Sequence, residues 1–309
     1  MTVTVTQMSI FRLNRLKSRK FSTELLKFVP KYSAVSEDDI KALRNFIDSS
    51  KKLLVLTGAG ISTESGIPDY RSEDVGLYAR TNHKPIQYQE FLKNAASRKR
   101  YWARNFVGWD TFSQRQPNVI HYSIRNLEHD LKKVSTVVTQ NVDNLHYKAG
   151  SEKVIELHGS GYRVICLGCK ANYDRHDIQR ELRKLNPHMP EATTMIRPDG
   201  DVEIPQEAID TFKQLFCVNC KGILKPDIVF FGDNVPLERV TAVKEAVTNS
   251  DSLLVLGTSL TVFSSYRIVL QAVEEKKKIA LVNIGQTRGD HLVNLKISGR
   301  CGEILPIVC

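Results

Sequence analysis

Two Cys-x-x-Cys pairs carry the strongest chemical signal in this chain. The pairs are Cys166 with Cys169 and Cys217 with Cys220. Each pair can present two thiolates to one tetrahedral ion, so we expect the four sulfurs to bind zinc. Because four sulfur ligands leave no open coordination position, this zinc would be structural, and hydrolysis by metal-bound water is disfavoured. Free or redox-active cysteines are the alternative.

One of the eight histidines, His158, has a context that suits catalysis. It follows the run Val154-Ile-Glu-Leu157, which is mostly apolar, and precedes Gly159. If that run is a strand of a parallel sheet, His158 lies at the carboxyl edge, where ligand clefts of α/β proteins form. An imidazole that titrates near neutrality can accept a hydroxyl proton. The alternative is a histidine that is satisfied within the core.

A glycine turn follows the apolar run Leu53 to Leu56. Gly58 and Gly60 in such a turn allow a phosphate to approach the backbone N–H groups of a following helix. Thr63 stands where a hydride-transfer fingerprint has its third glycine, and no ribose-binding acid follows at the expected distance. A nicotinamide dehydrogenase is therefore disfavoured. A tight turn without a ligand stays open as an alternative.

The elements that position these residues alternate between strand-like and helix-like patterns. Strands are predicted at 53–56, 134–139, 154–157, 253–257 and 279–283, with helices after the capping residue Ser36 and over 237–247. This alternation indicates an α/β fold with a parallel sheet and crossover helices. It is interrupted between about Gly161 and Lys225, where the cysteine pairs bracket a polar, proline-containing segment. We therefore predict a small inserted module there.

Composition and charge narrow the class of protein. The chain has 309 residues, of which 41% are hydrophobic and 25% charged, so fibrous and mostly disordered classes are excluded. No apolar run approaches the roughly 18 residues of a membrane-spanning helix, and no membrane partner is expected. The net charge is +10, but residues 1–32 supply +6 of it. A zinc-containing nucleic-acid adaptor, which needs a basic folded part, is therefore disfavoured.

Residues 1–32 have the composition of an organelle transit peptide. They contain seven bases, a single acid at Glu24, and apolar residues scattered among the cations. This composition predicts import into the mitochondrial matrix. A solvated, disordered basic tail is the alternative.

Four longer motifs, in this order and spacing, resemble the sirtuin family of NAD-dependent protein deacylases. They are Gly58 to Arg71, Thr139 to His146, His158-Gly159 and Gly257 to Leu260. The resemblance covers about residues 35 to 305. The basic leader and the segment Gly76 to Arg80 most resemble the mitochondrial class II group of this family. The resemblance implies a Rossmann-like domain over 33–160 and 226–309, with a zinc-binding module at about 161–225.

The resemblance also implies roles for individual residues. The catalytic residues would be His158, Asn141 and Asp143. The residues that contact NAD would be Gly58, Ala59, Gly60, Ser62, Asp69, Tyr70, Arg71, Gln140, Asn141, Asp143, Gly257, Thr258, Ser259, Asn283, Gly285 and Cys301. Substrate would meet Val229, Phe230, Phe231, Gly232, Tyr78 and Arg80. The chain departs from the family pattern at Tyr70, usually Phe, and at Gly285, where many members have an acid.

Some of these residues could have a purely structural role instead. Residues 140–143 could be a capped loop, 229–231 could be core, and His146 could be structural. The implied reaction consumes NAD: nicotinamide leaves, His158 takes a proton from a ribose hydroxyl, and the acyl group moves from lysine to ADP-ribose. Protein ADP-ribosylation at the same site is the alternative.

We expect acyl-lysine proteins, chiefly mitochondrial metabolic enzymes, as partners. Tyr78 and Arg80 suggest a preference for longer or acidic acyl groups, with lipoyl among them, over acetyl.

Overall fold

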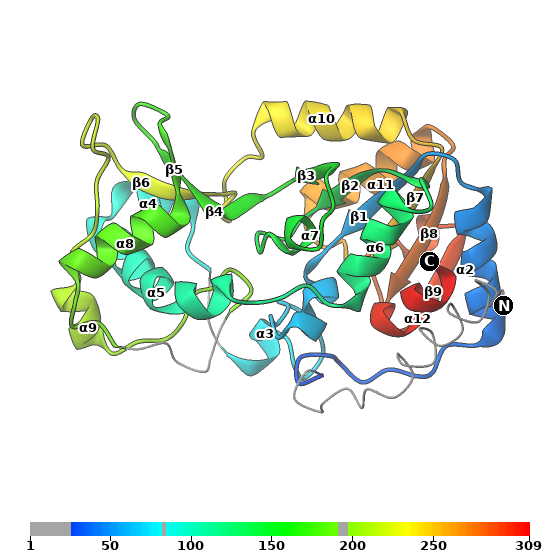
Figure 1. Ribbon diagram of the computed structural model, residues 1–309, viewed down its shortest axis with the longest axis horizontal. Coiled ribbons are helices and arrows are strands. Elements are labelled where there is room, and N and C mark those ends of the chain that lie inside the picture. The colour runs from blue at the N-terminus through cyan, green and yellow to red at the C-terminus, as the bar shows by residue number, and fades with distance from the viewer. Residues whose placement is uncertain (1–25, 82–84, 191–196) are drawn as a thin grey trace, which may run out of the picture.

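The computed structural model of the protein describes residues 26–81, 85–190 and 197–309 (Figure 1). Of the expected leader, residues 1–25 lie outside the described residues. A six-stranded parallel sheet forms the larger unit, with the strand order β3-β2-β1-β7-β8-β9. The strands are β1 (Leu53–Thr57), β2 (Val134–Thr139), β3 (Val154–Glu156), β7 (Ser252–Leu256), β8 (Lys278–Asn283) and β9 (Leu295–Ser298). The predicted α/β, Rossmann-like fold is confirmed.

The register of the central strands brings three loops to one edge of the sheet. Thr57 of β1 lies opposite Thr139 of β2 and Leu256 of β7. The chain therefore leaves these strands side by side at Gly58, Gln140 and Gly257. Because β1 and β7 are buried along their whole length, they read as continuous apolar runs rather than alternating ones.

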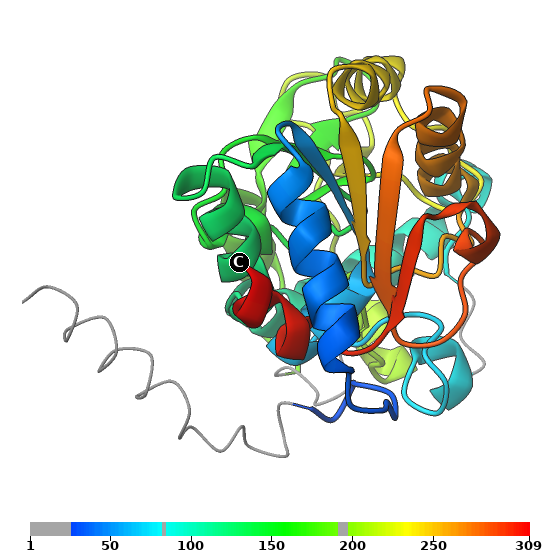
Figure 2. The same ribbon diagram turned by 90° about the vertical axis from the view of Figure 1, so that its right-hand side faces the viewer.

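Helices cover both faces of this sheet (Figure 2). On one face, α2 (Glu37–Ser49), α6 (Val119–His129) and α12 (Cys301–Val308) share a hydrophobic cluster with the strands, whereas α10 (Leu237–Thr248) and α11 (Phe263–Glu274) pack on the other. The predicted cap of α2 is present, since Ser36 Oγ accepts a hydrogen bond from Asp39 N at 3.1 Å. Short elements complete this unit: η1 (Ala59–Ser65), α3 (Leu77–Arg80), α7 (Leu145–Lys148) and η2 (Asp290–Leu292).

A smaller unit adjoins the carboxyl edge of the sheet (Figure 1). It contains an antiparallel sheet of order β5-β4-β6, formed by β4 (Gly159–Cys166), β5 (Asn172–Asp174) and β6 (Leu224–Ile228), with helices α8 (Arg175–Leu185) and α9 (Gln206–Thr211). Helices α4 (Tyr88–Lys93) and α5 (Ala95–Ser113) join the same hydrophobic cluster, which includes Trp102, Trp109 and Phe212. The smaller unit thus combines two separate stretches of chain, and the contribution of α4 and α5 was not predicted from the sequence.

None of the helices in the described part of the chain has the length and hydropathy needed to cross a bilayer.

Candidate active site

A cleft of about 1720 Å³ opens where the carboxyl edge of the parallel sheet faces the smaller unit. Ligand pockets are typically about 300–1,000 Å³, so this cleft has room for a dinucleotide together with a second ligand. All the residues that sequence analysis assigned to catalysis, NAD or substrate line it, except Gly58, Tyr78 and Arg80.

The two glycine turns meet at the base of the cleft. A Cβ atom on Gly58 would lie 2.6 Å from Thr258 Cβ, and one on Gly60 would lie 2.8 Å from the Gly257 carbonyl oxygen. Gly257 has a φ of 57°, which favours glycine. The N–H groups of Gly58 and Gly60 donate to the carbonyls of Leu256 and Gly257. These glycines therefore let the ends of β1 and β7 approach closely.

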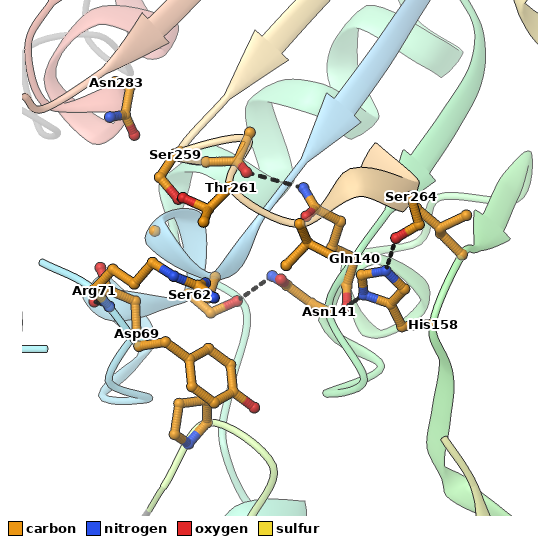
Figure 3. Close-up of a pocket in the computed structure, with 18 of the residues that line it drawn as sticks. Ser62, Asp69, Arg71, Gln140, Asn141, His158, Ser259, Thr261, Ser264 and Asn283 are labelled. Carbon is orange, nitrogen blue, oxygen red and sulfur yellow. Dashed lines mark hydrogen bonds between the residues drawn. The ribbon is translucent and has the colours of Figure 1, made fainter. Parts of the chain in front are cut away.

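Three buried polar residues form a continuous network beside this turn, and Figure 3 shows the contact between two of them, Ser62 and Asn141. Asn141 Nδ2 donates to the carbonyl of Gly58 and to Ser62 Oγ, each at 3.1 Å. Ser62 Oγ donates to Asp143 Oδ2 at 2.6 Å. Burial raises the pKa of Asp143, while the hydrogen bond from Ser62 acts in the opposite direction. The network presents an amide, a hydroxyl and a carboxyl group at one point of the cleft wall.

Gln140 joins the three central strand ends. Its Nε2 atom donates to the Thr57 carbonyl and to Thr258 Oγ1, each at 3.1 Å. Its own carbonyl oxygen lies 3.1 Å from His158 Nδ1. The side chain of Gln140 therefore positions the loop after β2, and its backbone positions the histidine.

The contacts of His158 fix which of its nitrogen atoms can act as a base. Because a carbonyl oxygen can only accept, Nδ1 donates to Gln140, and Nε2 then accepts from Ser264 Oγ at 2.8 Å (Figure 3). Burial lowers the pKa of His158 to about 4, and the Gln140 carbonyl opposes that shift. His158 is thus neutral at pH 7, with a lone pair on Nε2. Ser264 was missed from the sequence, since nothing near it in the chain signals this contact.

The loop after Pro68 is folded around Asp69. Its carboxylate accepts from Arg71 N at 3.1 Å, from Ser72 N at 2.8 Å and from Ser72 Oγ. Tyr70 stands with its ring centroid 6.3 Å from that of Phe231 across the cleft. Asp69 therefore shapes the turn that presents Tyr70 and Arg71.

At the other end of the cleft lie Ser259, Asn283, Gly285 and Cys301. Asn283 Nδ2 donates to the Ile284 carbonyl at 2.7 Å. Gly285 has a φ of 80°, and a Cβ there would meet no atom within 4 Å. Burial raises the pKa of the Cys301 thiol to about 12, so this thiol is unreactive at neutral pH. The cleft is therefore open at Gly285.

The segment 229–232 forms the wall on the side of the smaller unit. Val229 N donates to the His158 carbonyl at 2.9 Å, and the Phe231 carbonyl accepts from Tyr88 N at 2.9 Å. Tyr78 and Arg80 do not line the cleft. Arg80 Nε donates to the Val75 carbonyl at 2.8 Å, and its guanidinium lies 5.1 Å from the Phe28 ring centroid. The structure therefore does not bring Arg80 to an acyl pocket.

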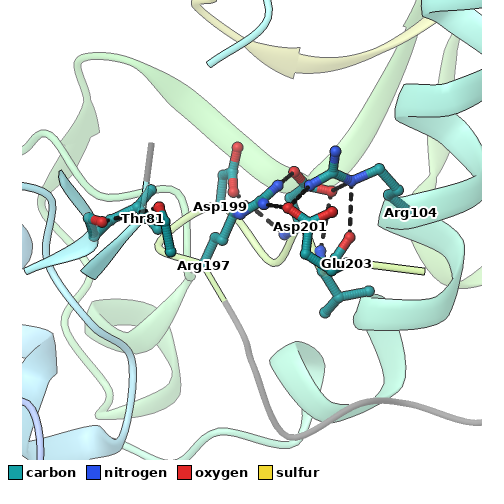
Figure 4. A network of polar contacts seen from close by, with 8 residues as sticks. Thr81, Arg104, Arg197, Asp199, Asp201 and Glu203 are labelled. Atoms are coloured by element: carbon teal, nitrogen blue, oxygen red, sulfur yellow. Dashed lines mark hydrogen bonds and ion pairs between the residues drawn. The ribbon is translucent and has the colours of Figure 1, made fainter. Parts of the chain in front are cut away.

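Pro198 and Asp199 also line the cleft, and sequence analysis did not find them. Asp199 is held by a network of charged residues at the smaller unit (Figure 4). Asp201 N donates to Asp199 Oδ1 at 3.2 Å, and Asp201 is paired with Arg197 and with Arg104, the latter at 3.0 Å. Burial and the nearby Asp201 raise the pKa of Asp199 to about 6.

The four cysteines of the paired motifs come together as predicted, with their sulfur atoms all within 4.8 Å of one another. Lys170 and Lys221, which follow the two pairs, both have positive φ values, so the two turns share one geometry. Four converging thiolates fit a tetrahedral zinc ion. Because β4 separates Cys166 from Gly159 by its full length, roughly 20 Å, the metal site is remote from His158.

Comparison with known proteins assigns the chain to a family. The Sir2 family model matches residues 58–264, and the chain belongs to the Sir2 family. It is 57% identical over 302 residues to the NAD-dependent protein deacylase Sirt4 of Drosophila melanogaster, covering 98% of this chain and 96% of the relative. It is 51% identical to the NAD-dependent protein lipoamidase sirtuin-4, mitochondrial, of Homo sapiens, covering 91% and 89%.

The solved structures agree. A Sir2–p53 peptide–NAD+ complex is 29% identical, with a TM-score of 0.67, and the match covers 87% of this chain and 96% of that one. The predicted resemblance to the sirtuins is confirmed.

Proposed function

We propose that this protein is an NAD-dependent protein-lysine deacylase that transfers the acyl group to ADP-ribose and releases nicotinamide. The observation that carries this proposal is the neutral His158, whose Nε2 lone pair faces a serine hydroxyl within a cleft large enough for NAD and an acyl-lysine. The relatives support it, because their names describe NAD-dependent deacylases and a lipoamidase. Those names do not favour ADP-ribosyl transfer, the alternative.

NAD, as the co-substrate, would supply a ribose that accepts the acyl group once nicotinamide has left, and one water would then be consumed as the free lysine and the O-acyl-ADP-ribose are released. His158 Nε2 exchanges its hydrogen bond from Ser264 for one from a ribose hydroxyl and accepts that proton. The Gln140 carbonyl keeps the Nδ1 proton in place and stabilises the positive charge that develops on the ring. Ser62, Asn141 and Asp143 provide donors and acceptors for the nicotinamide carboxamide.

The apolar wall holds the substrate lysine and keeps water out. Phe230 is buried, and Val229 and Phe231 border the same cleft. Exclusion of water protects the acyl group from premature hydrolysis and strengthens the hydrogen bonds of His158. Cys166, Cys169, Cys217 and Cys220 would hold zinc, which would fix the smaller unit that carries this wall.

We further propose that longer acyl groups are preferred over acetyl. The volume of the cleft and its apolar wall support this preference. The preference for acidic groups depended on Arg80, whose contacts with Phe28 and Val75 direct it elsewhere. The proposed location is the mitochondrial matrix, with metabolic enzymes as substrates. It is supported by the basic leader and by relatives that are named mitochondrial.

The test is incubation with NAD and a panel of acetyl-, lipoyl-, glutaryl- and methylglutaryl-lysine peptides, with nicotinamide and acylated ADP-ribose measured by mass spectrometry. We expect nicotinamide release that requires an acyl peptide and is lost in His158→Ala. Release of nicotinamide without acyl peptide, with ADP-ribose attached to protein, would instead support ADP-ribosyl transfer.

A further inference from the structure

The segment immediately before α2 borders the cleft, although sequence analysis placed most of it in the leader. This N-terminal segment, residues 28–35, runs from the start of α2 toward α3 (Figure 1). Val29 through Ser33 line the same cleft as Arg71 and Arg300. A leader that extended through residue 32 would therefore include part of the cleft wall.

Three contacts hold the N-terminal segment in this position. Val35 packs closely on Gly299, where any side chain would collide with it. The Arg300 guanidinium lies 5.4 Å from the Tyr32 ring centroid, and Arg300 also pairs with the buried Glu64 of η1 at 3.0 Å. At the far end, the Arg80 guanidinium lies 5.1 Å from the Phe28 ring centroid. Both cation–ring distances are within the range of cation–π attraction.

The contact at Phe28 reaches the turn that presents Tyr70 and Arg71. Arg80 is the last residue of α3, and its Nε atom also holds the Val75 carbonyl at 2.8 Å. The first turn of α3 is bonded to that turn, because Leu77 N donates to the Asp69 carbonyl at 2.8 Å and Tyr78 N donates to the Tyr70 carbonyl at 3.0 Å. Phe28 therefore restrains α3, and α3 in turn restrains Asp69 and Tyr70.

We propose that the N-terminal segment is part of the NAD-binding site and that Phe28 and Arg80 are positioning residues for NAD. The segment closes the outer side of the cleft, and the Phe28–Arg80 contact holds the loop 69–80 in its binding conformation. This inference rests on the proposed function, because it assumes that the cleft binds NAD.

The experiment compares Phe28→Ala, Arg80→Ala and the double variant of the full chain with the unaltered protein. The KM for NAD and the kcat are measured with a saturating lipoyl peptide, and the Kd for NAD is measured by calorimetry. Loss of one partly exposed cation–π contact should raise the KM and Kd for NAD about two- to fivefold. The double variant should resemble the worse single one, because both changes remove the same contact. The kcat and the ranking of acyl peptides should stay unchanged.

Two further variants separate positioning from general damage. Tyr122→Ala removes a half-exposed aromatic ring from α6, away from the cleft, and should leave the KM for NAD unchanged. Arg80→Lys keeps the cation and should recover part of the NAD affinity. The melting temperature of every variant shows whether the fold is intact.

Three results would overturn the inference. They are an unaltered KM for NAD in Phe28→Ala, a double variant whose effect is the product of the two single effects, and an Arg80→Ala variant that changes only the acyl ranking. Failure of the unaltered protein to bind NAD would instead refute the proposed function, and calorimetry without peptide distinguishes that case.

Discussion

If His158 is the base, the pH dependence of kcat/KM can be predicted quantitatively. Burial lowers its pKa to about 4, and only the neutral imidazole can accept a proton. At pH 5.5 a group with that pKa is about 97% neutral, whereas a histidine with the ordinary pKa of about 6.5 is about 9% neutral. We therefore expect kcat/KM at pH 5.5 to stay close to its value at pH 8, instead of falling about tenfold.

The assay measures initial rates of lipoyl-peptide turnover at low substrate concentration across pH 5 to 8. Each sample is then returned to pH 7.5 to show that the enzyme is intact. Asp199 also lines the cleft and has a pKa of about 6, so Asp199→Asn is measured in parallel. A tenfold loss with a midpoint near 6.5 that persists in Asp199→Asn would refute the reasoning about His158.

Four further predictions concern single residues. Gly58→Ala places a Cβ 2.6 Å from Thr258 Cβ. It should lower the free energy of unfolding, measured by urea titration, by about 1–3 kcal/mol. Unaltered stability would show that the strand ends can separate freely. Elemental mass spectrometry should find one zinc ion in the unaltered chain. Cys217→Ser should lose this ion and melt at a lower temperature. A full complement of zinc in that variant would contradict the four-cysteine site. Asp143→Asn preserves the shape of the side chain but removes a buried carboxyl group. It should lower kcat/KM at least about 100-fold and leave the melting temperature unchanged. Near-normal activity would count against a role of Asp143 in the reaction. His146 is buried with a pKa lowered to about 4, so the unfolded chain binds its proton first and stability should fall by about 3 kcal/mol as the pH drops from 6.5 to 4. In His146→Asn this part of the pH dependence of urea unfolding should vanish.

The parallel sheet could be predicted from sequence because its strands are buried on both faces. Buried strands appear as short, continuous apolar runs, and those at Leu53–Thr57 and Ser252–Leu256 lie within one residue of the predicted positions. Helix α5 gave no such signal. Its buried side chains meet partners far along the chain: Trp102 donates to the Leu224 carbonyl, 122 residues later, and Trp109 packs on Tyr162 and His176. Packing of that kind leaves no local pattern.

The candidate site likewise contains residues that a local sequence pattern predicts and residues that only distant contacts bring together. Residues in contiguous motifs, such as Gln140 and Asn141, could be placed from sequence because neighbouring strand ends share one edge. Ser264 could not, because its contact with His158 spans 106 residues. Arg80 was predicted to bind the acyl group because it follows the cofactor motif closely in the sequence. Its guanidinium instead contacts the ring of Phe28, which lies in the stretch whose composition indicates a targeting leader.

The hydrogen bond from Val229 N to the His158 carbonyl lies where two backbone segments connect the larger unit to the stretch between β4 and β6. Strands β4 and β6, which pair at Gly159 and Ile228, leave the larger unit together at this point, so the whole intervening stretch is attached through two adjacent backbones. This stretch also packs on α4 and α5 within one hydrophobic cluster, so the smaller unit is not held at this point alone. Because His158 directly precedes Gly159, this connection adjoins the histidine that Gln140 and Ser264 hold in place.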